Sequence, residues 1–136
     1  MNKTFWGTGN ETTKTSKKKQ YTIYSITCKR NGKKYIGVTC NYQARINVHI
    51  QKPPPKMLAD ARQYTPFLSN FSFDVLYKTR FRDLAMSIER FHIKNNKTTS
   101  KLGYNVLKGN PRHCSKYYFL KTNNRIWVIS FHFSVL

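Results

Sequence analysis

The stretch Tyr21–His49, YTIYSITCKRNGKKYIGVTCNYQARINVH, decides the fold. It begins with two short runs, Tyr21–Thr27 and Tyr35–Thr39, that are rich in aromatic and β-branched residues, a composition typical of β-strands. Between the runs lies Asn31-Gly32, the pair that best tolerates the positive φ angles of a tight turn. The sequence therefore predicts a β-hairpin.

A helix is predicted directly after the hairpin. Asn41 can cap its N-terminus, and Tyr42–Gln51 contains no helix breaker before a run of three prolines. Arg45 and His49 are four residues apart, so we expect both side chains on one face of this helix. Gly37, inside the second strand, is a poor strand residue, which indicates a bulge or the close approach of another group.

Further elements follow from the pattern of apolar residues. Alternation predicts a third strand at Phe71–Tyr77, and helical spacing predicts helices at Lys56–Tyr64 and Arg80–Lys94. The buried face of the last helix is predicted to contain Phe81, Leu84, Ala85, Ile88 and either Phe91 or His92. The expected fold is α/β (α+β), with a small three-stranded mixed or antiparallel sheet flanked by helices.

The chain is expected to have three parts. Residues 1–20 are polar, end in a run of lysines, and are predicted to form a flexible basic arm. Residues 21–110 form the folded domain. Residues 111–136 are predicted to form an accessory C-terminal β-hairpin, because apolar residues alternate from Trp127 to Val135. That apolar face requires a cover, either from the domain or from a second copy of the chain.

Composition points to a polyanionic partner. The chain has 25 Lys and Arg against five acids, a formal net charge of +20, and nucleic acid is the commonest partner of so basic a protein. No run of about 18 apolar residues exists, so no membrane-spanning helix is expected. Three cysteines without CxxC spacing argue against a disulfide framework and a zinc site. They favour a reducing, intracellular location: host cytoplasm, nucleus or organelle if the source is viral or organellar.

Carboxylates are scarce in this chain. A divalent metal needs oxygen ligands, and the short list of acids that can supply them is Glu11, Asp60, Asp74, Asp83 and Glu89.

Motifs in a fixed order resemble those of the GIY-YIG nuclease family. In chain order they are Thr22-Ile23-Tyr24, Tyr35-Ile36-Gly37, Arg45 with His49 one turn later, Glu89, and Gly103-Tyr104-Asn105. Thr22 stands where the family usually has Gly, which matters if the backbone there needs a positive φ. The resemblance implies the GIY-YIG fold over roughly residues 21–110.

The resemblance also implies a set of roles. Glu89 would hold one divalent cation, Mg²⁺ or Mn²⁺, which polarises the phosphoryl group. Tyr24 would take a proton from the attacking water or orient it, and Tyr35 would bond the phosphate or a metal-bound water. Arg45 would neutralise the phosphate, because its fork of donors suits two phosphate oxygens. Asn105 would position the site.

Two points depend on neighbours in space. His49 could bond a phosphate, assist proton transfer or be structural. A phenol with a pKa of about 10 is a poor base at neutral pH, and nearby cations would favour the phenolate form of Tyr24 if they lie close enough. The candidates are Lys33, Lys34, Arg45 and the metal.

The function that the sequence favours is a metal-dependent DNA endonuclease of the homing, restriction or phage and viral DNA-processing type. The alternative is a non-catalytic nucleic-acid-binding module, for which charge and tyrosines suffice. Glu89 distinguishes the two, since a pure binder has no use for a lone carboxylate in a basic cleft. Cutting both strands with one small site needs two copies or two events, which leaves a homodimer open. The predicted DNA contacts are Lys17, Lys18, Lys19, Lys33, Lys34, Gly37 and Arg45.

Overall fold

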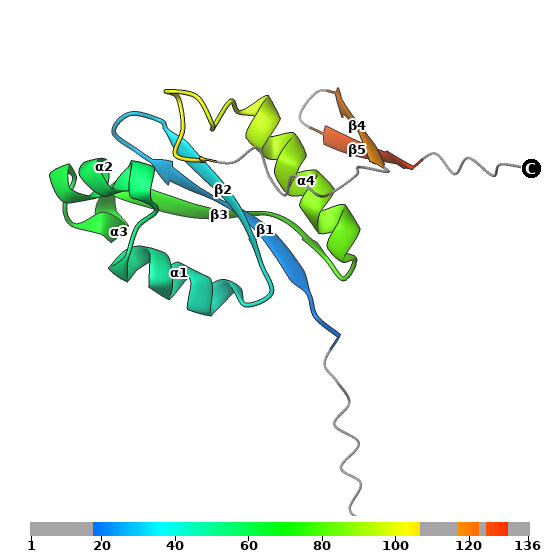
Figure 1. Ribbon diagram of the computed structural model, residues 1–136, viewed down its shortest axis with the longest axis horizontal. Helices are drawn as coiled ribbons and strands as arrows, with labels where there is room; N and C mark the ends of the chain where they lie inside the picture. The colour runs from blue at the N-terminus through cyan, green and yellow to red at the C-terminus, as the bar shows by residue number, and fades with distance from the viewer. Residues whose placement is uncertain (1–17, 107–116, 123–124, 131–136) are drawn as a thin grey trace, which may run out of the picture.

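The computed structural model describes residues 18–106 and the backbone of residues 117–122 and 125–130. The predicted strands and the helices at Tyr42–Gln51 and Arg80–Lys94 are confirmed, with bounds that agree to within two residues; the predicted helix Lys56–Tyr64 begins instead as a 3-10 turn. In chain order the elements of the domain are β1 (Tyr21–Cys28), β2 (Lys34–Thr39), α1 (Tyr42–Gln51), the 3-10 turn η1 (Pro55–Met57), α2 (Leu58–Gln63), α3 (Phe67–Asn70), β3 (Phe71–Thr79) and α4 (Arg82–Asn95) (Figure 1).

The three strands form one antiparallel sheet in the order β2-β1-β3. On the central strand, Ser25 lies opposite Ile36 on one side and Asp74 on the other. The register between β1 and β3 shifts at Ile23 and Tyr24. Helices α1 and α4 lie on opposite faces of the sheet (Figure 1). Because β2 is an edge strand, both helices can approach it, which places a potential site beside this strand.

The predicted hairpin turn is present between β1 and β2. Gly32 adopts a φ of 73°, the left-handed conformation that favours glycine. The N–H of Lys33 donates to Oδ1 of Asn31 at 3.0 Å, and the N–H of Cys28 donates to the carbonyl of Lys33 at 2.9 Å. The N–H of Gly32 donates to the carbonyl of Cys28 at 2.8 Å, so the turn is longer than a two-residue turn.

Alternation along β1 divides the core into two clusters. One cluster joins three residues of β1 to Ile46 of α1: Tyr24, Ile26, Cys28, Ile46, Met57, Phe71 and Tyr104. The other joins Ile23 of β1 and Ile36 of β2 to α4: Ile23, Ile36, Ala85, Ile88 and Ile93. Since successive strand residues point to opposite faces, one hairpin supplies both clusters.

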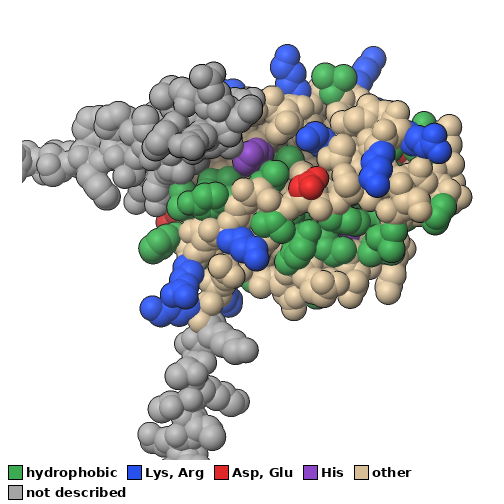
Figure 2. All heavy atoms as spheres, turned by 180° about the vertical axis from the view of Figure 1, so that it is seen from behind, with side chains coloured by type: hydrophobic (Ala, Val, Ile, Leu, Met, Phe, Trp, Pro, Cys, Tyr) green, Lys and Arg blue, Asp and Glu red, His purple; other side chains and the backbone are tan. Residues whose placement is uncertain are grey.

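One predicted core residue is exposed. Phe81 is 70% exposed, because its backbone is extended and α4 begins only at Arg82. The helical spacing that placed Phe81 on the buried face therefore does not reach it. Val75 and Tyr77 on β3 are also exposed. Figure 2 shows hydrophobic side chains gathered across one face of the molecule, with Lys and Arg side chains around them.

Beyond the domain, the backbone of β4 (Tyr117–Thr122) pairs antiparallel with that of β5 (Arg125–Ser130). Most of the predicted arm lies outside the described residues, as do three later segments: residues 1–17, 107–116, 123–124 and 131–136. The boundaries of the three parts and the accessory role of residues 111–136 stay predictions. No helix in the described part of the chain is long and apolar enough to cross a membrane.

Candidate active site

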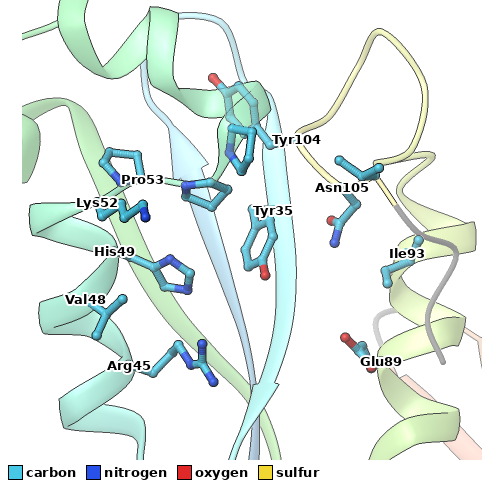
Figure 3. Close-up of a pocket in the computed structure, with 13 residues that line it drawn as sticks. Tyr35, Arg45, Val48, His49, Lys52, Pro53, Glu89, Ile93, Tyr104 and Asn105 are labelled. Carbon is cyan, nitrogen blue, oxygen red and sulfur yellow. The ribbon is translucent and has the colours of Figure 1, made fainter.

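A pocket of about 690 Å³ lies beside β2, between α1 and α4. Figure 3 shows Arg45 on α1 and Glu89 on α4 on opposite walls, with Tyr35 between them. The full lining is Tyr35, Arg45, Val48, His49, Lys52, Pro53, Pro54, Pro55, Glu89, Ile93, Tyr104, Asn105 and Val106. The pocket thus brings together a guanidinium, a phenol, an imidazole and one carboxylate.

Helix α1 supplies one wall of the pocket. Its start is fixed by Asn41, whose Oδ1 accepts a hydrogen bond from the N–H of Ala44 at 3.1 Å, as the sequence predicted. Arg45 and His49 both line the pocket, which confirms that they share a face. Lys52 lies three residues beyond His49 on the same wall. The wall therefore carries two permanent positive charges, at Arg45 and Lys52.

Tyr24 and His49 form a buried hydrogen bond. The hydroxyl oxygen of Tyr24 lies 2.7 Å from Nε2 of His49, and the two residues are 1% and 6% exposed. Burial, and then the positive charge of Arg45, lowers the pKa of His49, so its imidazole is neutral at neutral pH. Burial is also the largest cause that raises the pKa of Tyr24 above its usual range. With a protonated phenol beside a neutral imidazole, the Tyr24 O–H donates to Nε2 in the tautomer that carries its proton on Nδ1.

The sequence left open whether cations lie close enough to lower the pKa of Tyr24. Arg45 does lower it, but burial outweighs this effect and the pKa is raised. Lys33 is directed elsewhere, with its Nζ 5.9 Å from the centre of the Tyr104 ring. Tyr24 is therefore neutral in the folded protein, and any loss of its proton requires an acceptor such as His49.

Gly37 admits the ring of Tyr24. The two residues are cross-strand partners, and a Cβ on Gly37 would lie 2.5 Å from the Cζ and hydroxyl oxygen of Tyr24. This confirms the predicted close approach of another group. Thr22, in contrast, is an ordinary buried strand residue, and Lys97 is the one non-glycine residue in the described part with a positive φ. The Thr at this motif position therefore causes no backbone strain.

We expect Gly37→Ala to destabilise the domain. The added methyl group overlaps the Tyr24 ring, and overpacking of this kind typically costs about 1–3 kcal/mol. Urea unfolding followed by circular dichroism measures the loss. In a Tyr24→Ala background the ring is gone, so the same substitution should have little effect. Equal losses in the two backgrounds would contradict the steric explanation.

Tyr35, from the motif on β2, lines the pocket. Its ring centre lies 5.3 Å from that of His49 and 6.3 Å from that of Tyr24. Burial, followed by the negative charge of Glu89, raises the pKa of Tyr35. Figure 3 shows its hydroxyl directed toward the space between Arg45 and Glu89. Tyr35 is therefore a neutral hydrogen-bond donor at the centre of the pocket.

Asn105 pairs with β2 through its side chain. Its Oδ1 accepts a hydrogen bond from the N–H of Ile36 at 2.8 Å, and its Nδ2 donates to the Ile36 carbonyl at 2.9 Å. Gly103 lets the chain before Asn105 pack against Thr98, because a Cβ there would overlap the backbone of Thr98. The amide of Asn105 is thus engaged with the strand between Tyr35 and Gly37.

Glu89 faces the pocket from α4. Burial raises its pKa from 4.5 to about 7. Among the lining residues it is the one carboxylate. The described residues contain no group of three or more His, Cys, Asp or Glu side chains that could hold a metal. Any cation here would rely on Glu89 plus ligands from substrate and water, which is how Mg²⁺ usually binds.

Comparisons with known proteins identify the family. The family model described as the GIY-YIG catalytic domain matches residues 20–105. The chain belongs to the GIY-YIG family. Among solved structures, a variant of the catalytic domain of the intron endonuclease I-TevI shares the fold, with a TM-score of 0.58 and 20% sequence identity over 67% of this chain and 97% of that one. A comparison with curated proteins finds no significant match. This chain therefore carries a GIY-YIG-type endonuclease domain.

Some predicted site residues lie away from the GIY-YIG pocket. Tyr24 is beneath it and reaches it through His49. Gly37 is buried and admits the Tyr24 ring, and its predicted DNA contact stays a prediction. Lys33 and Lys34 are half-buried and do not line the pocket. Lys18 and Lys19 are exposed before β1, and Lys17 lies outside the described residues.

Part of the pocket lining was not predicted from the sequence. Lys52 and Val48 follow Arg45 at helical spacing, a signal that was present in the sequence. The three prolines Pro53–Pro55 were interpreted only as the end of a helix, yet they form part of the lining. Tyr104 was quoted within its motif without a role. Its hydroxyl donates to Oδ2 of Asp60 at 2.7 Å, which ties the motif to α2.

Proposed function

We propose that this chain is a metal-dependent DNA endonuclease whose single active site is the pocket between α1 and α4. The observation that carries the proposal is the placement of Arg45 and Glu89 on opposite walls with Tyr35 between them (Figure 3). A phosphodiester needs positive charge and donors at its oxygens, and the cation that assists the leaving oxygen needs a carboxylate. The pocket supplies both.

Glu89 fits the role of cation ligand. Burial without a compensating positive charge keeps its pKa near 7, so the free carboxylate is held in an unfavourable environment. A divalent cation would offset that burial. Mg²⁺ binds through one or two carboxylates together with substrate phosphate and water, so a single Glu is sufficient. Bound there, Mg²⁺ or Mn²⁺ would polarise the phosphoryl group and stabilise the leaving oxygen.

Arg45 and Tyr35 would bind the scissile phosphate. The guanidinium offers two parallel N–H donors to non-bridging oxygens, and its charge offsets that of the transition state. Burial and the charge of Glu89 keep the hydroxyl of Tyr35 protonated, so it would donate a hydrogen bond to the phosphate. Lys52, on the same wall as Arg45, is positioned for a neighbouring phosphate. These three residues bind and orient the substrate.

The Tyr24–His49 pair would accept the proton that the attacking water loses. A proton accepted at the Tyr24 oxygen is balanced by transfer of the phenol's own proton to Nε2 of His49, 2.7 Å away. The products of this step are hydroxide and an imidazolium. A neutral His49 with its proton on Nδ1 has Nε2 available as the final acceptor.

DNA as substrate is supported by the formal net charge of +20 and by the family. The type of endonuclease that we propose is homing, restriction or phage and viral DNA processing, acting in a reducing intracellular compartment. Lys33 and Lys34 on the hairpin, with the basic residues that precede β1, would add non-specific phosphate contacts. Double-strand cutting would involve a homodimer or two successive events.

The experiment that tests this function uses a labelled DNA duplex with Mg²⁺ or with chelator, resolved on a denaturing gel. We expect internal cleavage products with Mg²⁺ and intact strands with chelator. Intact strands under both conditions would contradict nuclease activity and favour the alternative of a non-catalytic binding module. Cleavage that persists in chelator would contradict the dependence on a metal.

The pH dependence of cation binding follows from Glu89. Because its pKa is about 7, a proton must leave below that pH before a cation binds. Affinity for Mn²⁺ should therefore fall by about tenfold for each pH unit below 7 and change little above it. Calorimetric titration of the protein bound to a DNA duplex that it cannot cleave measures this, because substrate phosphate supplies part of the ligand set, and Glu89→Gln is the control. A flat profile would exclude Glu89 as the ligand.

A further inference from the structure

Lys56 holds three backbone carbonyls. Its Nζ lies 3.1 Å from the carbonyl oxygen of Asn105, 3.3 Å from that of Ser100 and 3.4 Å from that of Thr99. An ammonium group has three N–H donors and no acceptor, so these contacts can engage all of its protons. Lys56 follows Pro53–Pro55 directly, and those prolines line the pocket.

The segment that Lys56 holds is also attached to β2. The N–H of Tyr104 donates to the carbonyl of Lys34 at 2.9 Å, and the Asn105 amide pairs with both backbone groups of Ile36. Lys34 and Ile36 flank Tyr35 in the sequence. The segment is therefore fastened to the strand on one side and to Lys56 on the other.

These contacts join two walls of the pocket. Pro53 and Pro54 lie between α1 and η1, and Pro55 begins η1, whereas Tyr104 and Asn105 come after α4. Both groups line the same pocket. The side chain of Lys56 spans from the first group to the backbone of the second. Loss of this connection would allow Asn105 to move away from Ile36, and Tyr35 would lose its fixed position.

We propose that Lys56 is a positioning residue for the nuclease reaction, acting through Asn105 on the strand that carries Tyr35. This inference rests on the proposed function of the pocket. In so basic a chain, Lys56 would otherwise be counted among the residues that bind phosphate. Its three carbonyl partners assign it to the scaffold.

The test compares Lys56→Met with Lys101→Met, a control that removes an exposed lysine from the same loop. Misplacing a reacting group by about 1 Å can cost about 10²-fold in rate, so we expect Lys56→Met to lower kcat by about 10- to 10²-fold. KM and the dependence of DNA affinity on salt should stay close to wild type. Lys101→Met should leave kcat unchanged. Lys56→Arg, which keeps the charge and donors, should retain more activity than Lys56→Met.

A phosphate-binding lysine would behave differently. Its loss would reduce the slope of log affinity against log salt by about 0.9 and leave kcat nearly unchanged. That result, or equal kcat values for Lys56→Met and Lys101→Met, would overturn the proposal. If Lys56→Met does not fold, by circular dichroism, Lys56→Arg and Lys56→Gln carry the same comparison.

Amide hydrogen exchange in the absence of DNA separates this proposal from the proposed function. The N–H of Ile36 donates to Asn105, so its exchange should accelerate by about tenfold or more in Lys56→Met and stay unchanged in Lys101→Met. Unchanged exchange at Ile36 would refute the positioning role, whether or not the protein cleaves DNA. Accelerated exchange in Lys56→Met, found together with a wild-type protein that does not cleave DNA, would refute only the proposed function.

Discussion

Replacing Glu89 by Gln is expected to abolish cleavage and to preserve DNA binding. The amide has nearly the same size as the carboxyl group but lacks the charge that holds a divalent cation. Because the pocket lining contains no other carboxylate, nothing nearby replaces it. We expect a fall in cleavage rate of more than about 10²-fold, the scale on which single groups that stabilise transition-state charge act. DNA binding should persist, because the Lys and Arg side chains of the protein are unchanged.

Asp74→Asn is the matched control for this experiment. Asp74 is an exposed carboxylate on β3, away from the pocket lining, so its loss changes the net charge by the same amount. Cleavage of a labelled duplex and fluorescence anisotropy of DNA binding measure the two properties separately. Cleavage by Glu89→Gln at the wild-type rate would contradict the assignment of Glu89 as the metal ligand. Parallel loss of binding and cleavage would indicate a structural role.

Replacing Tyr24 by Phe is expected to lower the rate far more than the affinity for DNA. The change deletes one hydroxyl, which forms a hydrogen bond with Nε2 of His49 within the core and does not line the pocket. Groups that accept or donate a proton in the transition state contribute about 10²–10⁴-fold, so we expect a loss of at least about 10²-fold in kcat. Tyr77→Phe, at an exposed tyrosine on β3, should be close to wild type.

A double-mutant cycle tests whether Tyr24 and His49 act as one unit. If the proton passes from Tyr24 to His49, the variant carrying both Tyr24→Phe and His49→Gln should lose little more activity than the worse single variant. Single-turnover rates with saturating Mg²⁺ supply the data. A loss of less than about threefold in Tyr24→Phe, or strictly additive losses, would remove Tyr24 from proton transfer.

The fold was predictable where local chemistry decides it. The hairpin around Asn31-Gly32 and the helix after Asn41 follow from turn and capping preferences that act within a few residues. Phe81 was misplaced because periodicity alone does not reveal where a helix starts. The antiparallel order β2-β1-β3 depends on contacts between segments far apart in the chain, and the sequence left parallel pairing open.

The site was predictable as a set of residues but not as a network. Motif order identified Arg45, His49 and Glu89, and the fold brings all three to one pocket. The hydrogen bond that joins Tyr24 to His49 connects residues 25 positions apart and could not be inferred from spacing. The same is true of the burial that raises the pKa of Tyr24 in spite of neighbouring cations. Lys56 was likewise indistinguishable from other lysines until its carbonyl partners were known.

The most direct test of the central claim is the conversion of supercoiled plasmid by wild-type protein and Glu89→Gln, each with Mg²⁺ and with chelator. The pocket between α1 and α4 predicts nicked or linear plasmid for the wild type with Mg²⁺ alone, and supercoiled plasmid in the other three reactions. Equal conversion by the two proteins, or conversion in chelator, would contradict a metal-dependent nuclease centred on Glu89.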